Sequence, residues 1–159
     1  MKYIQKLYDS APLHDIGKIK ISDAILNKPG KLTAEEYEIM KTHTIEGKKI
    51  LQDSLSDIED DSWLIMAVDM AMYHHEKWDG SGYPEGLSQN KIPLCARIMA
   101  VADVFDALVS ERAYKTPFTF EQAIQIMKEG SGKQFDPQIL EAFLGAENNI
   151  RFIMEQDIV

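Results

Sequence analysis

The sequence predicts an all-α fold with the helices packed as a bundle. Helical periodicity and helix-capping pairs recur along the chain, and no segment shows the alternation of polar and apolar residues that marks a β-strand. The 159 residues suffice for one hydrophobic core and leave no room for a second domain of normal size. We therefore expect a single domain over residues 1–159.

A capping box marks the first clear helix. Thr33 and Glu36 can exchange hydrogen bonds at a helix start, and an apolar period runs from there to Leu51, with an interruption at residues 42–44. A second helix, rich in Ala and Met, is expected over residues 61–76.

Three more helices are expected in the second half of the chain. Residues 92–109 are strongly apolar and have a proline near their start, where a helix tolerates it. Thr119 with Gln122 repeats the capping pattern. Asp136 followed by Pro137 is the N-cap and first-turn pair of a helix that includes residues 139–144.

Two segments break the helical pattern. Residues 22–31 contain the turn signal Pro29-Gly30, and residues 78–93 contain three glycines and two prolines. A loop as long as the second one inside a compact helical domain is usually functional.

The composition narrows the classes of partner and compartment. A net charge of −9 argues against a nucleic-acid polymer, and a phosphate-bearing ligand would need a local positive charge such as bound metal. Much of the acid lies in residues 53–61, which we interpret as a solvated loop between helices. No run has the length of a membrane span, and the N-terminus is not a signal peptide. The single cysteine, Cys95, is expected in the core, in agreement with a cytoplasmic location.

The few histidines of the chain indicate a metal site. They fall near apolar helix sequence in clusters roughly thirty residues apart, a spacing that lets packed helices each present one ligand to a shared centre. A carboxylate accompanies the first cluster, and another lies in an alanine-rich helix. The residues are His14, Asp15, His43, His74, His75 and Asp103.

Imidazole and carboxylate groups together suit Zn, Fe, Mn or Ni, and a carboxylate can bridge two ions. Lys18, one turn after Asp15, could hold a phosphate oxygen beside the metals. Each histidine taken alone could equally be structural. Asp106, one turn after Asp103, could be the inward carboxylate instead.

Five sequence blocks resemble the HD-GYP family in order and over nearly the whole chain. They are HDIGKIKISDAILNKPGKL, MKTHTIEG, HHEKWDGSGYPEGL, IPLCARIMAVADVFDALVSERAYK and GSGKQFDP. HDIGK by itself is typical of the wider HD phosphohydrolase superfamily, whereas its combination with HHE and GYP is specific to the HD-GYP group.

The resemblance implies a helical bundle of the HD type around two or three divalent metal ions, most often Fe or Mn, with Zn, Ni and Mg as alternatives. The implied ligands are the six residues named above. Lys18 would contact a phosphate or the nucleophilic water, and the Gly82, Tyr83 and Pro84 loop would lie at the pocket edge. Arg112 and Lys115 match phosphate-binding positions, although they could also form a solvated helix end, and Trp78 and Tyr83 could be loop anchors.

The activity implied by the resemblance is hydrolysis of cyclic di-GMP to pGpG or GMP, with Asp15 and Lys18 as catalytic residues. The alternatives are an HD phosphohydrolase for another nucleotide and a non-catalytic module that binds a nucleotide or a protein. The implied partners are a GGDEF domain and an upstream sensor or receiver domain.

The chain departs from the family pattern at its start. Family domains carry an early histidine, often with a glutamate, before the HD pair, whereas here only thirteen residues precede His14 and the only acid among them is Asp9. We expect an incomplete domain that binds fewer metals and hydrolyses slowly. We also expect an uncovered apolar face around Ile4, Leu7 and Tyr8 that favours self-association.

Overall fold

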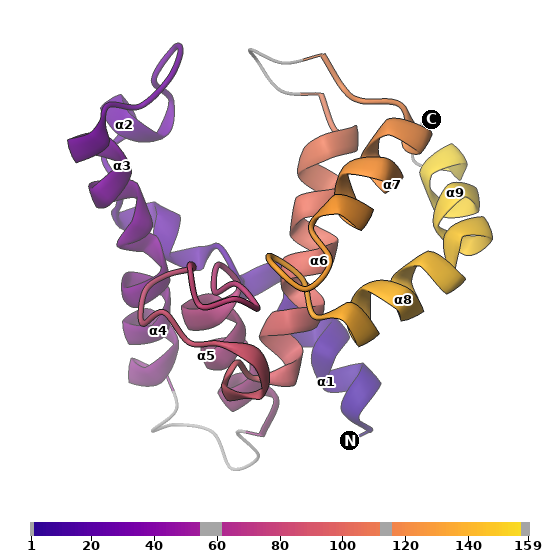
Figure 1. Cartoon of the computed structure of the whole chain (residues 1–159). Helices are drawn as coiled ribbons and strands as arrows, with labels where there is room; N and C mark the ends of the chain where they lie inside the picture. The colour runs from indigo at the N-terminus through magenta and orange to yellow at the C-terminus, as the bar shows by residue number, and fades with distance from the viewer. Residues whose placement is uncertain (1, 55–61, 112–115, 157–159) are drawn as a thin grey trace.

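The computed structural model describes residues 2–54, 62–111 and 116–156, and it confirms the all-α prediction (Figure 1). Within these ranges the backbone forms helices, and the single β-type contact is an isolated bridge between Ser131 and Phe135. None of the described helices is both long enough and apolar enough to cross a bilayer.

The helices follow one another with short connections. In the first half they are α1 (Tyr3–Ser10), η1 (Ala11–Leu13), η2 (Ile16–Lys20), α2 (Asp23–Leu26), α3 (Ala34–Lys41), α4 (His43–Asp53) and α5 (Ser62–Tyr73). In the second half they are η4 (Gln89–Lys91), α6 (Leu94–Val109), α7 (Phe120–Glu129), α8 (Pro137–Gly145) and α9 (Glu147–Gln156).

The helical segment expected to run to Leu51 consists of two helices, α3 and α4, which are divided where the apolar period is interrupted. The break falls at Thr42, whose hydroxyl donates to the carbonyl oxygen of Ile39 at 2.7 Å, while its N–H bonds the same oxygen. This local bonding competes with continuation of the helix. As a result, His43 becomes the first residue of a new helix.

The second predicted helix ends earlier than expected. α5 stops at Tyr73, so His74 and His75 lie in the turn that follows instead of on the helix. The predicted starting residue, Asp61, is outside the described residues, as is most of the acidic segment 53–61.

All three predicted helix caps are present. Reciprocal hydrogen bonds join Thr33 with Glu36 and Thr119 with Gln122, and the side chain of Asp136 accepts the N–H of Gln138 at 2.9 Å. These caps satisfy N–H groups that a helix start otherwise leaves unpaired.

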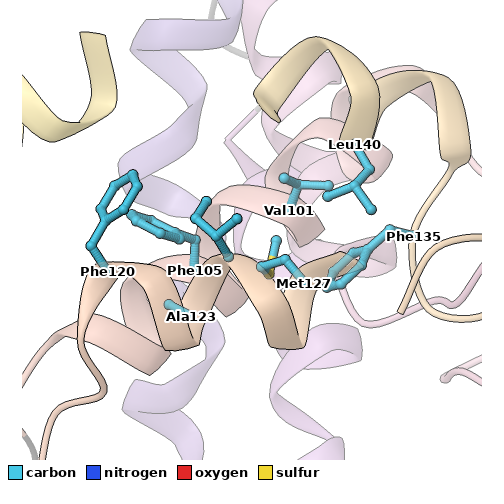
Figure 2. Close-up of a cluster of buried hydrophobic side chains, with 8 residues drawn as sticks. Val101, Phe105, Phe120, Ala123, Met127, Phe135 and Leu140 are labelled. Atoms are coloured by element: carbon cyan, nitrogen blue, oxygen red, sulfur yellow. The ribbon is translucent and has the colours of Figure 1, made fainter. Parts of the chain in front are cut away.

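Helix α6 joins two cores. On one side α6 meets α5 at Cys95, Met66 and Met70. Helix α5 packs in turn against α4 around Leu51 and Leu64. On the other side α6, α7 and α8 enclose an aromatic-rich core, where Phe105 meets Phe120 in the close-up of Figure 2. In Figure 1, α3 and α4 lie on one side of α6. The other side of α6 is occupied by α7, α8 and α9. Cys95 is buried as predicted, and burial raises the pKa of its thiol to about 11.

The apolar face of α1 is exposed, as expected. The side chain of Ile4 is 78% exposed and that of Tyr8 is 76% exposed. Both residues line an apolar hollow of about 290 Å³, together with Leu7 and Met99. Self-association through this face stays a prediction.

Candidate metal centre

The segment that carries the HD pair is held against α4 by contact between backbones. A Cβ atom placed on Gly17 would lie 1.9 Å from the carbonyl oxygen of His43 and 2.4 Å from the nitrogen of Gly47. Only glycine permits this approach of η2 to α4. The contact brings the turn with His14 and Asp15 beside the first residue of α4.

All six predicted ligand residues converge at one place. The ligand atoms of Asp15, His43, His74 and His75 lie within 4.8 Å of one another. His14 and Asp103 adjoin this group, because Nε2 of His14 lies 3.3 Å from Asp15 Oδ2 and 3.8 Å from Asp103 Oδ1. Of the two acids of α6, Asp103 lies beside the cluster, whereas Asp106 is exposed and accepts a hydrogen bond from the hydroxyl of Ser110.

Backbone carbonyl groups orient three of the imidazole rings. In each ring Nδ1 lies within hydrogen-bond distance of a carbonyl oxygen three or four residues earlier, so Nδ1–H can donate to that oxygen and Nε2 is directed to the centre. The distances are 2.8 Å from His14 to Ala11, 2.7 Å from His43 to Met40 and 2.9 Å from His74 to Met70.

Three buried polar atoms at the centre have no hydrogen-bond partner among the described residues. They are Oδ1 of Asp15 and Nε2 of His43 and His74. The carboxylate oxygen lies 3.4 Å from one nitrogen and 3.7 Å from the other. Unpaired buried polar atoms are costly, and a cation between them would satisfy all three at once. The nitrogen and oxygen donors therefore fit a divalent transition metal.

Charge is strongly organised around Asp15. Although burial opposes ionisation, hydrogen bonds from His14 and Lys18 hold the pKa of the Asp15 carboxyl well below its usual range. Burial likewise opposes the charge on His14, but Asp103 and Asp15 raise its pKa to about 10. Nζ of Lys18 lies 2.5 Å from Asp15 Oδ2.

We expect the metal-free protein to lose stability on acidification. Burial, with repulsion between neighbouring imidazoles, lowers the pKa of His74 to about 4 and that of His75 to about 3, from the ordinary 6.5. Below pH 6.5 the unfolded chain takes up protons that these folded rings refuse until about pH 4. The free energy of unfolding therefore falls as the pH drops through this window.

Urea unfolding of chelator-treated protein checks this pH dependence. His14 has the opposite sign, since its raised pKa stabilises the fold below pH 6.5 and the contribution is lost as the pH rises through about 10. A free energy of unfolding that stays constant or rises from pH 6.5 to 4 would contradict the assignment of neutral, buried His74 and His75.

The GYP loop lies directly against the cluster. The ring of Tyr83 stacks on the ring of His75, and the two centroids are 4.8 Å apart. The backbone N–H of Tyr83 also donates to the carbonyl oxygen of His75 at 3.2 Å. A Cβ atom on Gly82 would lie 2.3 Å from the nitrogen of Lys77, so the loop can fold here only with glycine. A cavity of about 300 Å³ is lined by Tyr83 together with His74 and His75.

A second connection anchors the same loop. The N–H groups of Trp78 and Asp79 donate to the carbonyl oxygens of Gln134 and Lys133, in the segment between α7 and α8. The guanidinium of Arg97 lies 5.8 Å from the Trp78 ring centroid. Trp78 therefore anchors the loop, which is the role that the sequence suggested for it.

Glu76 is a site residue that the sequence reasoning missed. It directly follows the two histidines, and this position was its only signal. It is 3% exposed, and its Oε1 accepts the N–H of Glu85 at 2.8 Å. Burial raises its pKa, although N–H groups of the loop partly offset this. Glu76 thus binds the loop backbone from within.

Replacing Glu76 with alanine should loosen the GYP loop. The change leaves buried N–H groups unpaired, and we expect a loss of roughly 2 kcal/mol in the free energy of unfolding. Hydrogen exchange should accelerate in residues 77–92 more than elsewhere. Glu141→Ala, on the exposed face of α8, is the control that should change neither quantity. Equal exchange in both variants would remove Glu76 from this role.

Arg112 and Lys115 lie outside the described residues, so their predicted contact with phosphate stays a prediction. Of the other predicted substrate-binding residues, Lys18 lies at the cluster, and Gly82, Tyr83 and Pro84 lie in the loop beside it.

The fold and the site define an all-α protein with a histidine–aspartate cluster of the kind that binds metal, and comparison with known proteins agrees. The HD domain family matches residues 4–139. The chain belongs to this family, and its HDIGK, HHE and GYP blocks are those of the HD-GYP group.

The chain is similar to named phosphodiesterases. It is 51% identical over 145 residues to a cyclic di-GMP phosphodiesterase of Vibrio cholerae, covering 91% of this chain and 30% of the relative. It is 48% identical over 155 residues to a cyclic di-GMP phosphodiesterase of Thermotoga maritima, and the match covers 98% of this chain and 41% of the relative. The crystal structure of a cyclic GMP-AMP specific phosphodiesterase of V. cholerae has the same fold, with a TM-score of 0.64 and 23% sequence identity. The match covers 93% of this chain and 39% of that structure's chain. The chain therefore spans less than half the length of these relatives.

Proposed function

We propose that residues 1–159 form the metal-dependent hydrolytic domain of a cyclic di-GMP phosphodiesterase. The observation that carries the proposal is the set of three facing, unpaired buried atoms on Asp15, His43 and His74, which a metal would satisfy. The relatives named as cyclic di-GMP phosphodiesterases support the substrate.

Six residues would hold the metal. Bound divalent metal supplies Lewis acidity, which polarises a phosphate and makes water a better nucleophile. The imidazole ligands suit Fe, Zn or Ni better than Mg. The HD-GYP resemblance favours Fe or Mn among the possible metals, and we propose two or three ions. The ligands are His14, Asp15, His43, His74, His75 and Asp103.

Lys18 and Asp15 would act together on the phosphate. The carboxylate of Asp15 faces two imidazoles and the Lys18 ammonium, so it can hold cations on both sides. The Lys18 side chain is partly exposed, and its ammonium can offset charge that develops on a phosphate during in-line attack. Tyr83 would close one wall of the cavity.

The proposed setting is bacterial second-messenger signalling in the cytoplasm. The HD-GYP resemblance suggests an upstream sensor or receiver domain, or a GGDEF domain, as partner. The second candidate functions are hydrolysis of another nucleotide and non-catalytic binding.

Metal removal tests the proposal. Protein purified without chelator is analysed for bound elements and assayed for conversion of cyclic di-GMP to pGpG and GMP by chromatography. We expect at least one transition ion per chain, loss of hydrolysis after chelation and recovery with Mn²⁺ or Fe²⁺. Hydrolysis that survives complete removal of metal would refute the proposal, and metal binding without hydrolysis would favour the binding module.

A further inference from the structure

A buried ion pair joins helix α6 to the start of helix α8. Nη1 of Arg97 lies 2.6 Å from Oδ2 of Asp136, and only 16% of the Arg97 side chain and 2% of the Asp136 side chain are exposed. The other oxygen of this carboxylate accepts the N–H of Gln138 at 2.9 Å, so Asp136 caps α8 and binds Arg97 at the same time. A buried charge that loses its partner is costly, and this cost keeps the two side chains together.

The same guanidinium also holds the GYP loop, residues 77–92. Nη1 donates to Oδ1 of Asn90 at 3.2 Å, and the guanidinium carbon lies 5.8 Å from the centroid of the Trp78 ring. Trp78 and Asn90 lie near opposite ends of the loop, and the N–H of Gln89 closes it by donating to the carbonyl oxygen of Trp78 at 3.0 Å. Arg97 therefore contacts both ends of a closed loop.

The two segments that Arg97 holds line the cavity beside the cluster. Tyr83 of the GYP loop and Gln134, two residues before Asp136, both line the cavity of about 300 Å³ at the metal cluster. Asp103, which lies beside the cluster, follows Arg97 by six residues in α6, or about 9 Å along the helix axis. One helix thus carries a carboxylate of the cluster and the side chain that holds two walls of the cavity.

We infer that Arg97 is a positioning residue, which fixes the GYP loop and the start of α8 relative to Asp103. It acts through the walls of the cavity rather than at the reacting atoms. Walls that hold a large diester in line with the nucleophile raise the rate, because a displacement of about 1 Å can slow a reaction about a hundredfold. The inference rests on the proposed function for its substrate.

Rates on two diesters separate positioning from stability. Cyclic di-GMP is much larger than bis(p-nitrophenyl) phosphate, so it meets more of the cavity wall. A loss of folded or metal-loaded protein lowers both rates equally and cancels in their ratio. Arg97→Met removes the guanidinium, and Arg97→Lys keeps a charge for Asp136 but not the planar group beside Trp78. Arg151→Met is the matched control, because Arg151 also pairs with carboxylates and lies over a ring, that of Phe120, but belongs to α9.

We expect Arg97→Met to lower kcat for cyclic di-GMP about tenfold more than kcat for bis(p-nitrophenyl) phosphate, with metal content unchanged. Arg97→Lys should recover part of this difference. Arg151→Met should leave the ratio of the two rates at the value of the parent protein.

Hydrogen exchange gives a second readout that needs no substrate. The N–H groups of Trp78 and Asp79 bond to the segment before α8, and the N–H of Gln138 bonds to the carboxylate that caps α8. We expect these three amides to exchange faster in Arg97→Met than in Arg151→Met.

The outcomes separate this inference from the proposed function. An unchanged ratio of rates in Arg97→Met, in a protein that hydrolyses cyclic di-GMP, would overturn the positioning role alone. If the parent protein does not hydrolyse cyclic di-GMP, the proposed substrate is wrong and hydrogen exchange decides the role of Arg97. Faster exchange at the three amides would then support the inference, and exchange equal to that of Arg151→Met would overturn it.

Discussion

Asp15→Ala is expected to abolish the proposed hydrolysis of cyclic di-GMP, with a fall in kcat/KM of roughly a thousandfold or more. The carboxylate lies at the centre of the cluster, within 3.3–3.7 Å of the Nε2 atoms of three histidines and 2.5 Å from Nζ of Lys18. The substitution removes the carboxylate that the three histidines and Lys18 share. We also expect the metal content of the purified protein to fall.

Asp106→Ala is the control for Asp15. Asp106 is also a carboxylate close to the cluster in sequence, three residues after Asp103, but it is exposed and bonds Ser110. We expect its replacement to leave metal content and kcat/KM near those of the parent protein. Circular dichroism should verify that both variants fold. An Asp15→Ala variant with full metal content and full activity would refute the assignment of Asp15 to the centre.

Gly17→Ala is expected to have the largest effect on stability. The new methyl group would lie 1.9 Å from the His43 carbonyl oxygen and 2.9 Å from Cα of Gly47, which are backbone atoms that cannot move aside cheaply. Either η2 separates from α4 or the chain unfolds. We expect a loss of roughly 3 kcal/mol or more in the free energy of unfolding, measured with urea.

Gly145→Ala is the matched control for Gly17, because among the described residues a Cβ atom there would meet nothing within 4 Å beyond its own stretch of helix. At the end of α8 it should leave stability unchanged or raise it slightly, since alanine restricts the unfolded chain. If both alanine variants unfold at the same urea concentration, the close backbone contact between η2 and α4 is not what holds the HD pair in place.

The sequence by itself determined the fold class and three helix caps, and it named the six residues that the structure brings together in one cluster. The caps at Thr33, Thr119 and Asp136 were predictable because each depends on hydrogen bonds between residues two or three positions apart. The cluster was predictable because histidine is rare in the chain and its positions match a known family pattern.

Only the tertiary structure decided where helices end and which groups face the centre. The end of α5 at Tyr73 places His74 and His75 in the turn after the helix, which the apolar period does not reveal. The period is interrupted near Thr42, but only the structure shows that a new helix begins at His43.

Other features of the site depend on contacts between segments far apart in the sequence. The approach of Gly17 to His43 and the meeting of Tyr37 with Tyr83 are of this kind. The choice of Asp103 over Asp106 depends on the distant His14 in the same way. Such contacts form through packing of whole helices, which local residue patterns do not encode, and this is why the sequence named the ligands but not their geometry.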